Sequence, residues 1–147
     1  MIKLGIMSFA HMHAYSYATA IAQVNGVELS AVWDDDAARG KAAAEQNGTT
    51  FAADLDAFLK SDIDGVIICS ENVKHRPMVE AAARAKKWIL CEKPLATTID
   101  DARAMVELCK KEGVGLGTAF PCRHVPPLVA VKNEIADGKY GNIYAAT

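Results

Sequence analysis

The sequence predicts an α/β fold built on a doubly wound, parallel β-sheet. Apolar runs of strand length alternate with segments that carry apolar residues at helical spacing, and the alternation continues up to Phe120. The runs are continuously apolar, which is typical of parallel strands that helices cover on both faces. A βαβα order of this kind favours right-handed crossovers within a single sheet.

The expected strands are short and follow one another at regular intervals. The clear ones read IKLGIMS, VELSAVW, GVIICS, WILCE and VGLGTAF, and they span 2–8, 27–33, 65–70, 88–92 and 114–120. A shorter and weaker strand is expected at 49–51. Since β-branched and aromatic residues are common in these runs, their composition agrees with their length.

Polar caps and glycines mark the ends of the expected helices. Asp36, Asp54 and Thr98 each precede a helical pattern and can accept hydrogen bonds from its first N–H groups. Gly48 and Gly113 follow two of these patterns as stop signals. The expected helices span 37–47, 56–60, 75–87 and 102–112, and a further one follows residue 13.

Composition limits the function. The chain has 147 residues, is 51% hydrophobic and carries a formal net charge of −2, so we expect one domain with a substantial core. This charge balance gives no electrostatic footprint for nucleic acid or for an anionic membrane surface. No apolar run approaches the roughly 20 residues that a membrane span needs, and the N-terminus does not resemble a secretory signal. We therefore expect a cytoplasmic protein without nucleic-acid or membrane partners.

The cysteines fit this compartment. Cys69, Cys91, Cys109 and Cys122 are widely spaced and form no C-x-x-C pair, so we expect them to be reduced. Cys69 and Cys91 fall inside apolar runs, which indicates packed thiols rather than nucleophiles.

Polar residues follow most of the expected strands. In doubly wound folds, ligands bind outside the carboxyl ends of the strands, where the strand order reverses. The residues to examine are therefore those directly after each strand. They are 8–13, Asp34, 70–72, 92–94 and 120–123.

The segment SFAHMH after the first strand occupies the place of a dinucleotide-binding G-x-G-x-x-G turn. Ser8, Ala10 and His13 stand where that turn has glycines. Ser8 and Ala10 are small, and N–H groups at the start of the following helix can still bind phosphate. His13 is large, so either the helix stands further from the strand or the loop takes another path with His13 turned outward. The residues expected to contact a cofactor here are Ser8, Phe9, Ala10, His11 and Met12.

Asp34 ends the second expected strand, 26 residues after Ser8 (34 minus 8). This spacing is close to that of the acid that binds the adenosine ribose in dinucleotide folds, about 20 residues on. Alternatively, Asp34 only opens the turn before the cap at Asp36. The acidic run 34–36 would repel a 2′-phosphate, and only Arg39 lies nearby to offset it. We therefore expect NAD, with NADP the weaker ligand.

A metal site formed by His11 and His13 is an alternative function for this turn. Two histidines at i, i+2 in a loop need at least one more ligand, and Asp34 or His75 would have to converge on them. We expect a hydrogen-bonding or substrate-facing role for one histidine instead, and no metal site.

The segment Glu92-Lys93-Pro94 resembles the E-K-P motif of the Gfo/Idh/MocA oxidoreductases, the family of glucose–fructose oxidoreductase and inositol dehydrogenase. The surrounding run 67–96 resembles the same part of that family, including Asn72 and His75 at their places after the fourth strand. The pattern GTAF-x-x-R and the ending IADGKYGNIYAAT also match the family, so the resemblance covers nearly the whole chain.

The resemblance implies a Rossmann domain that binds NAD or NADP, here residues 1–122. It also implies a C-terminal α/β domain that shapes the substrate pocket and mediates homo-oligomer formation. Residues 123–147 resemble only the connecting helix and the first strand, NIYAAT, of that second domain. The implied activity is hydride transfer from a hydroxyl of a sugar, polyol or related compound, with the isolated chain inactive. The alternatives are an NAD-binding module without catalysis and, less favoured, a phospho-receiver domain, whose acidic pair would stand where Ser8 is.

The family also implies roles for individual residues. Lys93 would lie near the nicotinamide ring and stabilise alkoxide charge as hydride leaves the substrate. Glu92 would hold Lys93 or contact the nicotinamide ribose, and Arg123 would reach toward nicotinamide or substrate. The residues after the fourth strand would line the path of the cofactor or cap the following helix; they are Ser70, Glu71, Asn72 and His75.

Overall fold

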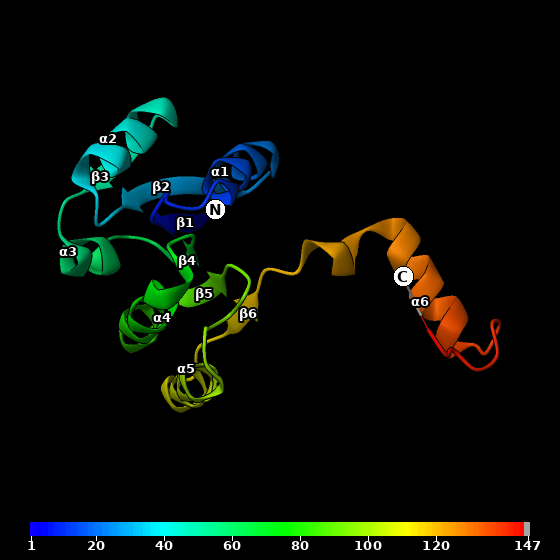
Figure 1. Cartoon of the computed structure of the whole chain (residues 1–147). Coiled ribbons are helices and arrows are strands. Elements are labelled where there is room, and N and C mark those ends of the chain that lie inside the picture. Colours follow the sequence, from blue (N-terminus) through cyan, green and yellow to red (C-terminus); the bar gives the residue numbers. More distant parts are fainter. Residues whose placement is uncertain (146–147) are drawn as a thin grey trace.

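The computed structural model describes residues 1–145 and has the predicted doubly wound α/β architecture (Figure 1). One parallel sheet has the strand order β3-β2-β1-β4-β5-β6. The strands are β1 (Ile2–Met7), β2 (Val27–Trp33), β3 (Thr50–Ala52), β4 (Gly65–Ile68), β5 (Trp88–Cys91) and β6 (Leu116–Thr118). All six strands expected from the sequence are present within a few residues of their predicted ends.

Helices connect the strands as expected. They are α1 (His13–Gln23), α2 (Ala37–Gln46), α3 (Leu55–Lys60), α4 (His75–Arg84), α5 (Ile99–Glu112) and α6 (Pro126–Ala136), with the short 3₁₀ helices η1 (Asn72–Lys74) and η2 (Pro121–His124). The predicted caps are confirmed, since the side chains of Asp36, Asp54 and Thr98 accept hydrogen bonds from the first turns of α2, α3 and α5. Gly113 ends α5 with φ +71°, a left-handed conformation that favours glycine.

Each face of the sheet has its own hydrophobic core. Helices α1 and α2 cover one face, where Ile6 and Val32 are fully buried. Helices α3, α4 and α5 cover the other, where Met7 and Phe58 are fully buried. Ile6 and Met7 point to opposite faces because successive strand side chains alternate. Burial on both faces explains why the strands read as continuous apolar runs.

The C-terminal part of the described chain departs from the sheet. Helix α6 extends away from it in Figure 1, and its apolar residues, among them Leu128 and Val131, are exposed. No strand forms over 142–145, and the rest of NIYAAT lies outside the described residues. A strand needs a hydrogen-bonded neighbour, and within residues 1–145 none lies beside this segment, so its assignment as the first strand of a second domain stays a prediction.

The burial of the cysteines agrees with the packed thiols that the sequence indicates for Cys69 and Cys91. Cys69, Cys91, Cys109 and Cys122 are all free thiols, and the first three are buried. Burial raises the pKa of Cys69 and Cys91, so both thiols stay protonated at neutral pH. Within residues 1–145, no helix is long and apolar enough to cross a membrane.

Candidate functional site

The candidate site lies at the carboxyl ends of the strands, where β1 and β4 are neighbours. The chain continues from β1 toward β2 and β3 on one side, and from β4 toward β5 and β6 on the other. The loops that follow β1 and β4 therefore diverge and leave a crevice, which is the usual ligand position in such sheets. The predicted residues after β1, β2, β4 and β5 all meet at this edge.

Ser8 takes over the conformation of the first glycine of the turn. Its φ is +71°, in the left-handed region, and the residue is fully buried. Its N–H donates to the Trp33 carbonyl at 2.7 Å, and its hydroxyl accepts from the Ala10 N–H at 3.1 Å. These bonds hold serine in a conformation that glycine usually occupies.

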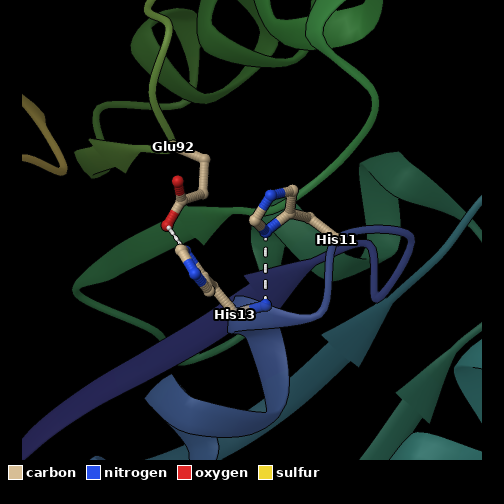
Figure 2. Close-up of side chains that lie close together, drawn as sticks. All are labelled: His11, His13 and Glu92. Atoms are coloured by element: carbon tan, nitrogen blue, oxygen red, sulfur yellow. Dashed lines mark hydrogen bonds and ion pairs between the residues drawn. The ribbon is translucent and has the colours of Figure 1, made fainter.

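His13 is the first residue of α1 and turns outward, toward Glu92. Its Nδ1 lies 3.0 Å from Glu92 Oε1, and its side chain is about one third exposed (Figure 2). The small residues Ala14 and Ala18 are buried in the core beneath α1 instead. Of the two paths that the sequence left open for this loop, the structure therefore has the one with His13 outside.

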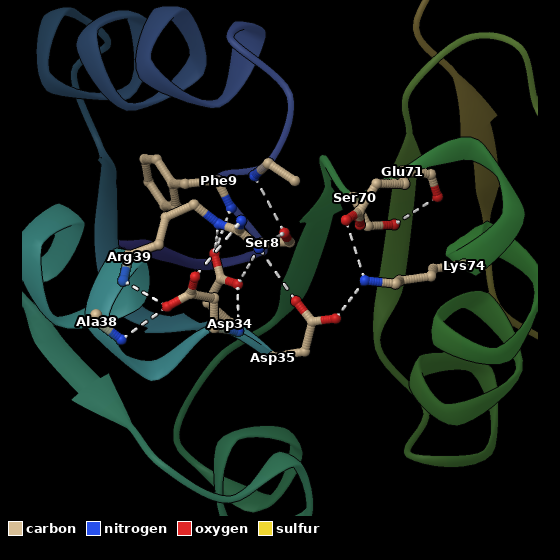
Figure 3. Close-up of polar contacts among 11 residues, drawn as sticks. Ser8, Phe9, Asp34, Asp35, Ala38, Arg39, Ser70, Glu71 and Lys74 are labelled. Carbon is tan, nitrogen blue, oxygen red and sulfur yellow. Dashed lines mark hydrogen bonds and ion pairs between the residues drawn. The ribbon is translucent and has the colours of Figure 1, made fainter.

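Asp34 is buried at the crevice, and both oxygens of its carboxylate accept hydrogen bonds. Oδ2 accepts from the Phe9 N–H at 2.7 Å and from Arg39 Nε at 2.9 Å, and Oδ1 accepts from the Asp36 N–H at 2.9 Å and from Arg39 Nη2 at 2.6 Å (Figure 3). Burial works against ionisation, but Arg39 and the two N–H groups outweigh it and lower the pKa of Asp34. The side chain is thus an ionised carboxylate that points into the dinucleotide turn.

A chain of charges continues from this pair across the crevice. Arg39 Nη2 also donates to Asp35 at 3.1 Å, and Asp35 in turn accepts from Lys74 Nζ at 2.5 Å (Figure 3). Lys74 belongs to η1 after β4 and also pairs with Glu71 at 3.0 Å. The ion pair between Asp35 and Lys74 therefore links the loop after β2 to the loop after β4. Lys74 could not be selected from the sequence, because its partner Asp35 is 39 residues away.

Glu92 is the second buried carboxylate of the site, with 1% of its surface exposed. Its Oε1 accepts from the Tyr17 hydroxyl at 2.6 Å, and its Oε2 accepts from the Lys93 N–H at 3.0 Å. Burial opposes ionisation, but the bonds from Tyr17, His13 and the Lys93 N–H lower the pKa of Glu92. Burial and the same carboxylate raise the pKa of Tyr17, which stays a hydroxyl donor. Tyr17 was not singled out from the sequence, since a tyrosine on a helix reads as a packing residue.

The other predicted residues differ in how they face the crevice. Lys93 and Asn72 are exposed, and within residues 1–145 the Lys93 ammonium makes no hydrogen bond or ion pair. Ser70 is buried, and its hydroxyl donates to the Glu71 carbonyl at 3.3 Å. Arg123 is exposed in η2, with its guanidinium 5.5 Å from the centre of the Phe120 ring.

His75 is fully buried at the start of α4. Its Nδ1 lies 3.0 Å from the Pro94 carbonyl, and its Nε2 lies 3.3 Å from the Ser70 carbonyl. The ring therefore fastens the loop after β5 to the end of β4. In this position it supports Lys93 through the backbone and offers no surface to a ligand.

The arrangement fits a dinucleotide, with one rearrangement. Asp34 stands where the adenosine ribose would bind, and within residues 1–145 the Met12 N–H, at the start of α1, has no hydrogen-bond acceptor and is free for a phosphate. The His11 N–H already donates to the Cys69 carbonyl at 2.9 Å, so it is not available to a phosphate. Ribose hydroxyls could reach the Asp34 carboxylate only if Arg39 moved aside.

Replacing Glu92 by glutamine tests the bonds that hold this carboxylate. A carboxylate whose pKa is lowered by folding adds stability above its unfolded pKa, about 4.3, and loses it as the pH falls through the folded value. We expect Glu92→Gln to lose about 1–3 kcal/mol of unfolding free energy at pH 7, and the difference from the wild type to shrink below about pH 4. Urea unfolding between pH 7 and 3.5 measures this, with the exposed Glu107→Gln as control. A difference that does not change with pH would contradict the assignment.

Comparison with known proteins agrees with this geometry. The family described as "Oxidoreductase family, NAD-binding Rossmann fold" (GFO_IDH_MocA) matches residues 2–120. The chain is 36% identical over 126 residues to 1,5-anhydro-D-fructose reductase of Ensifer adhaerens, covering 84% of this chain and 38% of that protein. It is 34% identical over 142 residues to inositol 2-dehydrogenase of Rubrobacter xylanophilus, covering 95% of this chain and 41% of that protein.

Solved structures give the same result. A putative myo-inositol dehydrogenase from Sinorhizobium meliloti aligns with a TM-score of 0.86 and 30% identity, over 96% of this chain and 43% of its own. The WlbA dehydrogenase from Bordetella pertussis, solved with NADH and UDP-GlcNAcA, aligns with a TM-score of 0.91 and 27% identity, over 97% and 42%. The chain thus spans about 40% of the length of these relatives. It belongs to the Gfo/Idh/MocA oxidoreductase family and corresponds to that family's NAD-binding Rossmann domain.

Proposed function

We propose that this chain binds NAD and serves hydride transfer from the hydroxyl-bearing carbon of a sugar, polyol or related compound. The observation that carries the proposal is the meeting of Asp34 and the Glu92-Lys93-Pro94 segment at one edge of the sheet, on the two sides of the crevice between β1 and β4. The named relatives, an inositol dehydrogenase and an anhydrofructose reductase among them, support this class of substrate.

NAD, when bound, would supply the hydride acceptor of the proposed reaction. Lys93 has an exposed ammonium without a partner in residues 1–145, so it is available to a substrate hydroxyl. Its positive charge would stabilise the alkoxide that forms as the hydroxyl proton passes to water, before the hydride leaves the adjoining carbon and the carbonyl forms. Glu92 positions Lys93 through the bond from the Lys93 N–H, and Tyr17 and His13 hold Glu92 in turn. Ser70, Glu71, Asn72 and Arg123 remain proposed contacts of cofactor or substrate.

The proposed cofactor preference is NAD over NADP. Asp34, Asp35 and Asp36 place three carboxylates where a 2′-phosphate would lie, whereas Arg39 is the one nearby guanidinium and is paired with Asp34. NAD binding requires Arg39 to exchange its bonds to Asp34 for solvent or Asp35. NADP could use Arg39 too, and a relative of known structure is in complex with NADP, but the phosphate would still face the carboxylates.

Titration with both cofactors tests the proposal. We expect NAD(H) to bind at least tenfold more tightly than NADP(H), a difference of about 1.4 kcal/mol, which is modest for one repelled phosphate. Isothermal titration calorimetry on the chain measures both affinities. Equal affinities would remove the proposed preference, and no binding of either cofactor would remove the proposed function.

A second candidate is an NAD-binding module without catalysis of its own. It is favoured by the exposed Lys93 ammonium, which makes no hydrogen bond or ion pair in residues 1–145. Turnover of a polyol and sugar panel with oxidised cofactor separates the two. In either case we propose a Rossmann domain at 1–122, a cytoplasmic location and, for a chain that includes a substrate domain, a homo-oligomer.

A further inference from the structure

His11, His13 and Glu92 form a cluster of three potential metal ligands, here named the His–Glu cluster. One ligand atom from each residue lies within 4.8 Å of the others (Figure 2). We propose that the His–Glu cluster binds a divalent transition metal, with Zn²⁺ as the probe. Asp34 and His75 were the third ligands considered from the sequence, but the structure brings Glu92 to the two histidines instead.

The distance between two of the potential ligand atoms is near the distance between ligand atoms around a bound ion. Zn²⁺ lies about 2.0–2.2 Å from imidazole nitrogen and carboxylate oxygen, so two ligands of a tetrahedral ion are roughly 3.4 Å apart. His13 Nδ1 and Glu92 Oε1 are 3.0 Å apart, close to this value. His11 is the ligand that must move closer to the other two, and it lies in a loop and not in a helix or strand. A shift of about 1 Å in that loop would therefore complete the ligand set.

Charge also favours a cation at this place. Glu92 is 1% exposed, and within residues 1–145 its one ion-pair partner is His13, which is positive only when protonated. A buried carboxylate without a permanent positive partner is costly. A divalent ion would neutralise Glu92 at any pH at which the histidines are unprotonated. Of the other cations of the crevice, Arg39 and Lys74 are paired with the carboxylates after β2, and within residues 1–145 the exposed Lys93 ammonium makes no ion pair with Glu92.

Groups behind the ligands already hold two of them in place. Tyr17 and the Lys93 N–H donate to Glu92 at 2.6 and 3.0 Å, and the His11 N–H is tied to the Cys69 carbonyl at 2.9 Å. Such outer contacts orient ligands and raise metal affinity. Binding has a cost, because the 3.0 Å hydrogen bond between His13 Nδ1 and Glu92 Oε1 must be given up. If Nδ1 is also the ligand atom of His11, the 3.2 Å bond that it accepts from the His13 N–H is lost as well.

The donor set selects the kind of metal. Two imidazoles and one carboxylate suit Zn²⁺, Co²⁺ and related ions, whereas Mg²⁺ and Ca²⁺ prefer oxygen ligands only. His11 and His13 are partly exposed, so a bound ion would keep at least one position open to water or to an oxygen of a ligand in the crevice. This inference does not depend on the proposed oxidoreductase function.

Calorimetric titration of the chelator-treated, dialysed chain with Zn²⁺ tests the proposal. We expect one ion per chain with a dissociation constant in the micromolar range or below, and at least a tenfold weaker affinity in His11→Ala, His13→Gln and Glu92→Gln. Cys122 and His124 are exposed and two residues apart in η2, so they could bind Zn²⁺ adventitiously. The control variants are therefore Cys122→Ser and His124→Ala, which should bind Zn²⁺ as tightly as the wild type.

Co²⁺ absorption identifies the ligands directly. We expect visible bands of a site with nitrogen and oxygen ligands and no thiolate charge-transfer band. Circular dichroism confirms that each variant is folded, and NAD titration in the presence of chelator reports cofactor binding separately from metal binding. The proposal is overturned if Zn²⁺ does not bind, if binding survives in all three cluster variants, or if it is lost in Cys122→Ser.

Discussion

We expect Lys93→Met to lower turnover by about 100- to 1,000-fold in a protein that joins this chain to a substrate domain, and to leave NAD affinity within a few-fold of the wild type. The reason is that the Lys93 ammonium acts on charge that develops only in the transition state, and the loss of one such contact typically costs this much. Methionine keeps much of the length and removes the charge. Since Lys93 is exposed and its side chain has no partner in residues 1–145, the fold should not change.

Steady-state kinetics and cofactor titration measure the two quantities separately. The matched control is Lys110→Met, which removes an exposed lysine from α5 and should leave kcat and kcat/KM unchanged. A Lys93→Met enzyme with full turnover would make Lys93 an ordinary surface lysine. A loss that appears only in KM would mean that Lys93 binds substrate and transition state equally.

Asp34→Ser shifts cofactor preference from NAD toward NADP, with NAD affinity about 10- to 100-fold lower. A hydrogen bond to a charged group contributes about 1.5–3 kcal/mol, and each 1.4 kcal/mol is tenfold in affinity. The substitution also releases Arg39, whose Nε and Nη2 now bond to Asp34. A free guanidinium can pair with the 2′-phosphate, since arginine suits bidentate phosphate binding.

Calorimetry with NAD(H) and NADP(H) measures this shift, and Asp35→Ser is the matched control. The Asp35→Ser variant loses the same negative charge as Asp34→Ser. In the wild type, however, Asp35 bonds to Arg39 and Lys74 and not to the dinucleotide turn. We expect Asp35→Ser to change NAD affinity by less than threefold. If the two variants behave alike, net charge and not the position of Asp34 sets the preference. Circular dichroism must show that Asp34→Ser is folded, because the N–H groups of Phe9 and Asp36 lose an acceptor.

Local features of the fold could be predicted from the sequence because they depend on a few neighbouring residues. The second strand matches its prediction at both ends, and Asp36, Asp54 and Thr98 cap the helices that they precede. A cap needs only a side-chain oxygen and the N–H groups two or three residues on. Residues 142–145 form no strand here, and a strand in this segment would depend on a partner outside the segment.

The placement of single site residues at strand ends was likewise determined by the sequence. Asp34 directly follows β2, and Glu92 and Lys93 directly follow β5. Their approach to one crevice follows from the parallel sheet, since all carboxyl ends lie at one edge. What the sequence determined about this protein is therefore its fold class, its family and the edge at which its site lies.

Only the tertiary structure decided which of these residues touch. Glu92 meets His13 and Tyr17 from 79 and 75 residues away, and Lys74 meets Asp35 from 39. These contacts depend on the order of the strands, the path of the turn around Ser8 and the rotamers of long side chains. The contact between Arg39 and Asp34 was also decided only by the tertiary structure. The two residues are five positions apart, and this spacing did not indicate that the guanidinium would bond to the Asp34 carboxylate. No local pattern encodes such pairs, since their free energy is set by packing and burial that exist only after the whole sheet has formed.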